Sequence, residues 1–123
     1  MPKTVMLVED ELFVAMDVQM TFEDDGWKAV GPFTNISEAL EYLEDGRADC
    51  AIVDVRLIDG EAYPVADRLV GLGIPFIFHS GHANARELEK RYPNAPFVGK
   101  PSLPVELVDV ANHLTKISAR ASA

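Results

Sequence analysis

Cysteine and long apolar runs are both scarce in this sequence. Its 123 residues include a single cysteine, Cys50, so no disulfide framework can form within the chain. No apolar run approaches the roughly 20 residues of a membrane-spanning helix, and the first residues lack the basic and apolar regions of a signal peptide. We therefore expect no membrane insertion, a cytoplasmic location, and a buried structural role for the Cys50 thiol.

Positive charge is also in short supply. Eleven Lys and Arg residues face twenty Asp and Glu residues, which leaves a formal net charge of -9. Direct nucleic-acid binding depends on neutralising phosphates with basic side chains, so this balance predicts proteins or cations as partners and no direct nucleic-acid contact. No glycine-rich phosphate loop follows the first apolar run, where the acids 9–11 would repel a phosphate in the absence of a cation.

The chain has the size and balance of one globular domain. Apolar residues make up 48% and charged residues 25% of the sequence, and 123 residues can bury a real core without metals or disulfides. We expect a single domain over residues 1–123, in which 118–123 form a short small-residue tail, with no room for an output domain in this chain.

Short apolar runs alternate with helical patterns along the whole chain. Strands are expected at about 3–8, 27–32, 49–53, 75–79 and 96–99, and helices at about 11–24, between Asn35 and Gly46, at 61–71, at 83–92 and from 104 to 117. This alternation is typical of βαβ units. It predicts an α/β fold with a doubly wound, flavodoxin-like parallel sheet of five strands in the order 2-1-3-4-5, with helices on both faces and 27–32 at an edge.

Acidic residues, a serine and a lysine follow the predicted strands, at the ends where parallel sheets commonly bind ligands. Glu9 and Asp10 end the first strand, Asp54 the third, Ser80 the fourth and Lys100 the fifth. Because the carboxyl ends of parallel strands share one edge of the sheet, these side chains should meet there. Three carboxylates repel one another without a cation, and hard oxygen ligands of this kind suit Mg²⁺ beside a phosphate. A lysine supplies a point charge for that phosphate.

In these residues the sequence resembles the response-regulator receiver domains of two-component signalling. The acidic pair, Asp54, Ser80 and Lys100-Pro101 stand in that family's order and approximate spacing, and the resemblance covers essentially the whole chain. It implies that Asp54 accepts a phosphoryl group from a histidine kinase or histidine phosphotransferase and that a downstream target protein reads the result. A receiver assists its own phosphorylation and dephosphorylation and is not a turnover enzyme on a small molecule. A homodimer is left open.

The resemblance also assigns the metal site. Asp10 would bind Mg²⁺ directly, Glu9 mostly through water, and the backbone carbonyl of Arg56 would join Asp54 in the metal shell. Lys100 would contact the phosphoryl group, and the Lys100-Pro101 peptide would be cis, an uncommon isomer even before proline.

A further set of residues would transmit or tune the signal. By resemblance, Ser80 swings toward the new phosphoryl group and Phe97 moves inward, so that the face of the helix at 83–92, the strand at 96–99 and the last helix switches. Phe97 could instead be a static core residue. Arg56 and His82 match family positions that control the access of water to the aspartyl phosphate.

The sequence departs from the family pattern in places. Ile58 stands where the family usually has proline, so the loop 57–60 is expected to differ. The segments 63–66 and 73–78 resemble a subgroup of stand-alone bacterial receivers, although residues 80–82 read Ser-Gly-His where that subgroup has Thr-Gly-Tyr. Three functional alternatives remain: a stand-alone receiver, a receiver fragment of a longer regulator with an output domain, and a flavodoxin-like module that binds a small ligand.

The first helix carries more apolar residues than one buried stripe needs. Val14, Val18 and Phe22 recur every fourth position and suit the core, while Leu12, Phe13, Met16 and Met20 extend apolar surface around the helix. The last helix could cover this excess, or it could stay exposed for docking. In receivers the first helix packs on the kinase, so we expect Met16 or Met20 to contact the partner.

Overall fold

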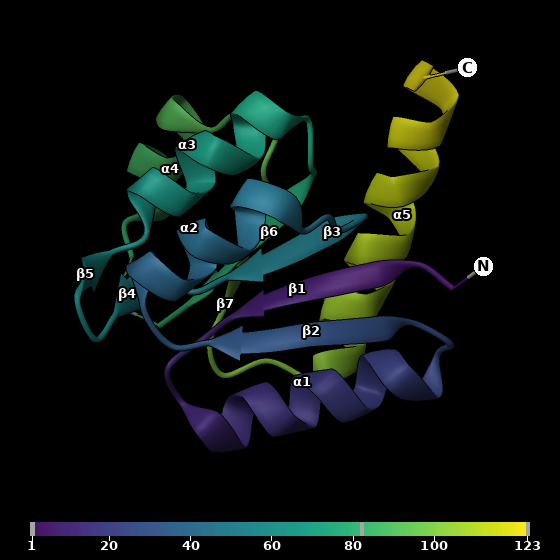
Figure 1. Cartoon of the computed structure of the whole chain (residues 1–123), viewed down its shortest axis with the longest axis horizontal. Helices are drawn as coiled ribbons and strands as arrows, with labels where there is room; N and C mark the ends of the chain where they lie inside the picture. Colours follow the sequence, from purple (N-terminus) through teal and green to yellow (C-terminus); the bar gives the residue numbers. More distant parts are fainter. Residues whose placement is uncertain (1, 82, 123) are drawn as a thin grey trace.

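The computed structural model is a five-stranded parallel sheet between two layers of helices (Figure 1). It describes residues 2–81 and 83–122, the last five of these (118–122) by their backbone alone. The sheet has the order β2-β1-β3-β6-β7, formed by Lys28–Phe33, Thr4–Val8, Cys50–Val53, Phe76–Ser80 and Phe97–Gly99. The helices are α1 (Leu12–Asp24), α2 (Ile36–Asp45), α3 (Tyr63–Leu72), α4 (Ala85–Arg91) and α5 (Pro104–Ser122). Because β6 and β7 are the fourth and fifth strands of the large sheet, this confirms the predicted flavodoxin-like order.

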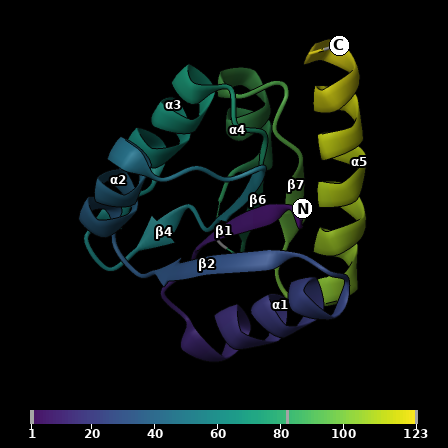
Figure 2. The ribbon, with the colours of Figure 1, turned by 45° about the vertical axis from the view of Figure 1, so that its right-hand side comes forward.

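The sheet buries both faces, because successive side chains of a strand point to opposite sides. Alternate residues such as Met6, Val53 and Phe78 form one core with α2, α3 and α4. Their neighbours Val5 and Ile52 form a second core with α1 and α5. Figure 2 shows the same two layers after a rotation of 45°. The unbroken apolar runs of the sequence are thus explained by strands covered on both faces.

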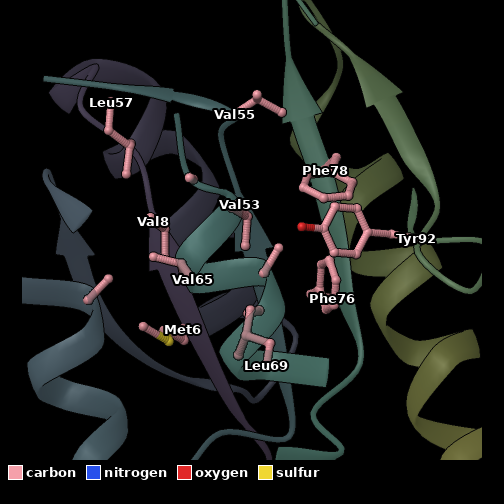
Figure 3. Packing of buried hydrophobic residues seen from close by; sticks show 14 of the residues in the cluster. Met6, Val8, Val53, Val55, Leu57, Val65, Leu69, Phe76, Phe78 and Tyr92 are labelled. Atoms are coloured by element: carbon pink, nitrogen blue, oxygen red, sulfur yellow. The ribbon is translucent and has the colours of Figure 1, made fainter. Parts of the chain in front are cut away.

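The first core contains an aromatic group that belongs to the fourth strand and to the end of α4. The rings of Phe76 and Phe78 lie 5.9 and 5.3 Å from the Tyr92 ring, centroid to centroid (Figure 3). Tyr92 also stacks on Tyr63 at 6.3 Å. Aromatic contacts of this kind add to the free energy gained by burial, so Tyr92 fastens α4 to α3 and β6.

Local chemistry explains where several helices begin and end. The Asn35 side chain accepts a hydrogen bond from the Glu38 backbone N–H at 2.8 Å, so Asn35 caps α2 at its N-terminus. Asn84 caps α4 by accepting from the N–H groups of Arg86 and Glu87. Gly73 has a left-handed φ of 71° and ends α3, a conformation in which glycine carries no steric cost.

The edge position predicted for the second strand is confirmed. β2 pairs with β1 alone, and the register shifts between Met6 and Val8. The Gly31-Pro32 peptide within it is cis. Gly31 has a φ of +100°, and a Cβ there would lie 2.6 Å from the Leu7 carbonyl oxygen, so only glycine fits at this irregularity.

The structure differs from the expected elements at one loop. Residues Arg56–Leu57 (β4) and Gly60–Glu61 (β5) form a small antiparallel hairpin that the sequence patterns do not predict, and α3 begins at Tyr63, two residues after the expected start at about 61. The Asp59 carboxylate accepts a hydrogen bond from the Ile36 backbone N–H at 2.8 Å and ties this hairpin to the start of α2. Apart from the end of the last helix, the other predicted ends lie within two residues of the observed ones.

The last helix is longer than the sequence pattern indicated. α5 continues to Ser122, through most of the segment expected to be a tail, and its end rises beyond the sheet (Figure 1). Alanine and arginine, which are frequent there, favour helix even without burial. Within the described part of the chain, no helix is both long enough and apolar enough to cross a bilayer.

Cys50 and Trp27 both belong to the core that α1 and α5 cover. Cys50 is fully buried, and burial raises the pKa of its thiol to about 12, which fits the predicted structural role. Trp27 is buried as well, with its ring edge-on to the Phe22 ring at a centroid distance of 5.3 Å.

Candidate functional site

The carboxyl edge of the sheet brings acids and a lysine together. The backbone N–H of Glu9 donates to the Phe33 carbonyl at 3.0 Å, that of Asp54 to the Val8 carbonyl at 2.9 Å, and that of Lys100 to the Ser80 carbonyl at 3.2 Å. Each residue therefore extends the hydrogen bonding of the strand that precedes it. The fold itself places these side chains, because the strands that carry them are neighbours.

The Lys100 ammonium lies among three carboxylates. Its Nζ is 2.6 Å from Glu9 Oε1, 3.0 Å from Asp54 Oδ2 and 3.5 Å from Glu11 Oε1. The Lys100, Glu9 and Asp54 side chains are only 12%, 7% and 7% exposed, whereas Glu11 is 61% exposed. The backbone N–H of Arg56 donates to Asp54 Oδ1 at 3.3 Å. The Asp54 carboxylate is thus oriented by a donor at each oxygen.

Burial and charge shift the pKa values of this group. Burial raises the pKa of the Glu9 carboxyl to about 7; the hydrogen bond from Lys100 opposes this shift, and the neighbouring Asp54 adds to it. Burial by itself would lower the pKa of Lys100, but its hydrogen bonds to Glu9 and Asp54 outweigh burial and raise it. Lys100 therefore remains a cation at neutral pH, and Glu9 is close to its titration midpoint.

The acidic cluster has the chemistry of a divalent-cation site, although its members differ from those expected. Carboxylate oxygens of Glu9, Glu11 and Asp54 all lie within 4.8 Å of one another. Asp10, the predicted direct ligand, is half-buried and lines the same cavity without belonging to that closest group. The family pattern does not identify Glu11 as a ligand. The signal for it was present, because residues 9–11 are three consecutive acids. Oxygen donors in this number suit Mg²⁺.

A cavity of about 580 Å³ opens beside the cluster. Among its lining residues are Asp10, Asp54, Arg56, His79 and Lys100. The Arg56 side chain is exposed and Lys100 largely buried, so positive groups lie both at the surface and in the interior of the cavity. The cavity is large enough for a phosphoryl group and carries charges of both signs next to Asp54.

The predicted switch residues lie on the last two strands of the sheet. Ser80 is the final residue of β6 and is buried, and Phe97 begins β7, pairs with Phe78 and is half-buried against the core under α4. The Lys100-Pro101 peptide is cis. His82 lies outside the described residues.

The apolar excess of α1 stays exposed. Val18 and Phe22 are buried and Val14 half-buried, as the spacing predicted. Met16 and Met20 are 55% and 59% exposed, and Leu12 and Phe13 are 59% and 87% exposed. The alternative that the last helix covers these four side chains was therefore wrong.

Comparisons with known proteins agree with this geometry. The family described as the response regulator receiver domain matches residues 5–112. A curated relative, the transcriptional regulatory protein PdtaR of Mycobacterium tuberculosis, is 27% identical over 90 residues, which are 73% of this chain and 44% of that protein. The chain thus spans less than half the length of the curated relatives it matches.

Solved structures show the same likeness. SdrG from Sphingomonas melonis Fr1 is 30% identical, with a TM-score of 0.74 over 88% of this chain and 92% of that one. A response regulator receiver protein from Sinorhizobium medicae WSM419 is 25% identical, with a TM-score of 0.84 over 95% and 97% of the two chains. A CheY-like receiver domain from Methanospirillum hungatei JF-1 is 18% identical and shares the fold, with a TM-score of 0.88 over 98% and 99%. This chain belongs to the response regulator receiver domain family.

Proposed function

We propose that this protein accepts a phosphoryl group on the Asp54 carboxylate, from the phosphohistidine of a kinase or histidine phosphotransferase. The observation that carries the proposal is the placement of the Lys100 ammonium 3.0 Å from Asp54 Oδ2 at the wall of a cavity of about 580 Å³. Receiver domains are signalling domains rather than small-molecule enzymes, which fits a protein that is itself the acceptor.

For phosphoryl transfer the protein has to align the acceptor carboxylate with the donor and to neutralise the charge of the phosphoryl group. A carboxylate oxygen of Asp54 forms a bond to phosphorus while the bond from phosphorus to the donor nitrogen breaks, which yields an acyl phosphate and a free imidazole on the donor. Lys100 supplies positive charge where the phosphoryl oxygens arrive. The Arg56 backbone N–H and the Lys100 ammonium hold the acceptor carboxylate in one orientation.

Receiver domains bind Mg²⁺ at an acidic pocket, and the residues here fit that ion. In our proposal Glu9, Asp10 and Asp54, with the backbone carbonyl of Arg56, would hold it, and Glu11 is close enough to join them. Bound there, Mg²⁺ would supply charge that offsets both the acids and the incoming phosphoryl group.

Phosphorylation would then change the conformation of the face formed by α4, β7 and α5, which a target protein would recognise. The new group carries a charge of roughly -2 and accepts strong hydrogen bonds. Ser80 would turn toward it, and Phe97 would move into the space that opens. Arg56 and His82 would set how readily water removes the phosphoryl group.

The length of the curated relatives supports a second form of the proposal, in which the receiver is part of a longer regulator. The curated relatives are more than twice as long as the matched segment and are described as transcriptional regulators. The same phosphoacceptor chemistry could therefore serve an output domain attached to a longer chain, as well as a stand-alone receiver that acts on a target protein.

The test is mass spectrometry of the intact protein after incubation with acetyl phosphate and Mg²⁺. We expect a gain of about 80 Da, the mass of one phosphoryl group, that disappears with a chelator and in Asp54→Ala. Asp17→Ala, which removes another acid that lines the cavity, is the matched control and should be labelled like wild type. Labelling of Asp54→Ala at the wild-type rate would remove Asp54 as the acceptor.

A further inference from the structure

His79 is a buried polar residue to which the proposed mechanism assigns no role. It is the next-to-last residue of β6, is 4% exposed, and lines the cavity beside Asp54. Its ring nitrogen Nε2 lies 2.9 Å from the hydroxyl oxygen of Ser102, which is 23 residues away in the chain. By strand alternation His79 points to the α1 and α5 side of the sheet, opposite to Ser80.

This contact holds the turn that carries Lys100. On one side of Pro101, the Lys100 backbone N–H donates to the Ser80 carbonyl at 3.2 Å. On the other side, Ser102 is bound by the His79 ring. Two adjacent residues of β6 therefore fasten the segment 100–102 at both ends. The Lys100 side chain extends from this segment to reach Glu9 at 2.6 Å and Asp54 at 3.0 Å.

The environment favours a neutral His79. Burial lowers the pKa of its imidazole, and the positive charge of Lys100 lowers it further. A neutral ring has one N–H donor and one acceptor nitrogen, and a serine hydroxyl can both donate and accept, so either tautomer can make the bond to Ser102.

We propose that His79 is a positioning residue for phosphoryl transfer: its hydrogen bond to Ser102 fixes the turn at residues 100–102 and thereby the place of the Lys100 ammonium beside Asp54. This inference rests on the proposed function of Asp54 as the phosphoacceptor. Its physical basis is that misplacement of a charged group by about 1 Å can cost a large factor in rate, so a bond that holds the turn contributes to the reaction without touching the substrate.

The test compares Ser102→Ala with Ser102→Thr, because Ser102 is half-buried at the surface and its loss should leave the fold intact. The measured quantity is the rate of Asp54 labelling by acetyl phosphate at saturating Mg²⁺, followed by intact mass. We expect Ser102→Ala to slow labelling about tenfold and Ser102→Thr, which keeps the hydroxyl, to remain within about twofold of wild type. His79→Gln combined with Ser102→Ala should be no slower than the slower single variant.

Thr115→Ala is the matched control. The Thr115 hydroxyl accepts a hydrogen bond from Lys3 at 3.2 Å on α5, away from the site, so its loss should leave the labelling rate unchanged. Wild-type labelling of Ser102→Ala, failure of Ser102→Thr to restore the rate, or independent losses in the double variant would each overturn the positioning role. Equal labelling of Asp54→Ala and wild type would instead overturn the proposed function itself.

Discussion

Either Asp10 or Glu11 could be the third carboxylate that binds a cation together with Glu9 and Asp54. Asp10 holds the position expected from the family pattern, but the oxygen atoms closest to Glu9 and Asp54 belong to Glu11. Glu11 is 61% exposed and its backbone N–H donates to Glu9 Oε2 at 3.2 Å, so it both supports Glu9 and faces solvent. Exposure weakens the electrostatic contribution of Glu11, because water and salt screen its charge.

We predict that Asp10→Asn lowers Mg²⁺ affinity by roughly tenfold or more, because it removes a carboxylate that we propose as a direct ligand. Glu11→Gln, its matched control, should lower affinity by less. Isothermal titration calorimetry with Mg²⁺ measures both. A larger loss in Glu11→Gln would transfer the ligand role from Asp10 to Glu11.

A second residue-scale prediction concerns the Tyr92 hydroxyl. It donates to Asp67 Oδ1 at 2.6 Å from a side chain that packs against Phe76 and Phe78. Burial raises the pKa of this phenol above its ordinary value, and the hydrogen bond to Asp67 raises it further. We expect Tyr92→Phe to lower the free energy of unfolding by about 1–2 kcal/mol, the cost of one hydrogen bond to a charged group on the surface of α3. Urea denaturation measures it.

Tyr42→Phe is the control for that measurement. Its hydroxyl donates to the Arg47 carbonyl at 2.7 Å in an exposed setting, where water replaces the lost bond. Its effect should stay within about 0.5 kcal/mol. Equal losses in the two variants would mean that burial adds nothing to the bond between Tyr92 and Asp67.

Among the helices, α4 has the weakest attachment to the core. It spans Ala85–Arg91, and Leu88 is its buried residue, followed by Tyr92 at its end. Arg91 adds a contact to α3, with its guanidinium 4.4 Å from the Tyr63 ring centroid and 3.5 Å from Asp67. A short helix with few apolar anchors opens locally at low cost, which suits an element that must move.

We therefore predict that a phosphoryl mimic changes hydrogen exchange in α4 and its flanks more than elsewhere. Beryllofluoride with Mg²⁺ should alter the exchange rates of amides within residues 80–100, while those of β1 should change little because β1 is an inner strand, paired with β2 on one side and β3 on the other. Exchange measured by mass spectrometry that is identical across residues 80–100 with and without the mimic would rule out α4 as the output element.

The exposed apolar face of α1 leads to a prediction about partner docking. We expect Met16→Glu to slow phosphoryl transfer from the cognate kinase or phosphotransferase about tenfold, equivalent to an interface contact of about 1.4 kcal/mol. Labelling by acetyl phosphate should be unchanged, because Met16 is 55% exposed and not part of the core. Val70→Glu, at 59% exposure on α3 in the opposite layer, is the control and should leave both rates as they are. If Met16→Glu slows both donors alike, Met16 does not act through docking.

At the scale of the whole molecule, the site imposes a pH dependence on stability. The pKa of Glu9 rises from 4.5 to about 7 on folding, so between these values the folded protein binds more protons than the unfolded chain. The contribution of Glu9 to the free energy of unfolding is therefore full below about pH 4.5 and is lost as the pH rises through about 7. The loss amounts to at most about 3 kcal/mol.

Glu9→Gln should remove this component. In the presence of a chelator, urea unfolding of wild type and Glu9→Gln at a series of pH values between 4.5 and 8 gives two stability curves, and their difference isolates Glu9 from the other carboxylates. We expect wild type to lose stability relative to the variant as the pH rises. Parallel curves would show that Glu9 does not titrate near neutrality in the folded protein.

Sequence patterns are enough to predict the sheet order, the strands buried on both faces and the convergence of Glu9, Asp54 and Lys100. These features follow from local patterns, namely apolar runs, helical spacing and the residue at each strand end, together with the rule that parallel strands end at a common edge. The same local information did not predict the hairpin of β4 and β5, which a hydrogen bond between Asp59 and Ile36, 23 residues apart, links to the start of α2.

The side-chain contacts and the exposed surfaces follow only from the way the layers pack together. Periodicity showed that α1 has too many apolar residues for one stripe, but only the packing of α5 leaves Met16 and Met20 uncovered. Nor does any pattern near His79 point to Ser102, or any pattern in three consecutive acids select Glu11 over Asp10 as the nearest neighbour of Asp54. Such contacts depend on ångström-scale placement of loops, and that placement is set by the summed packing of the layers, because no local sequence pattern encodes a distance between segments far apart in the chain.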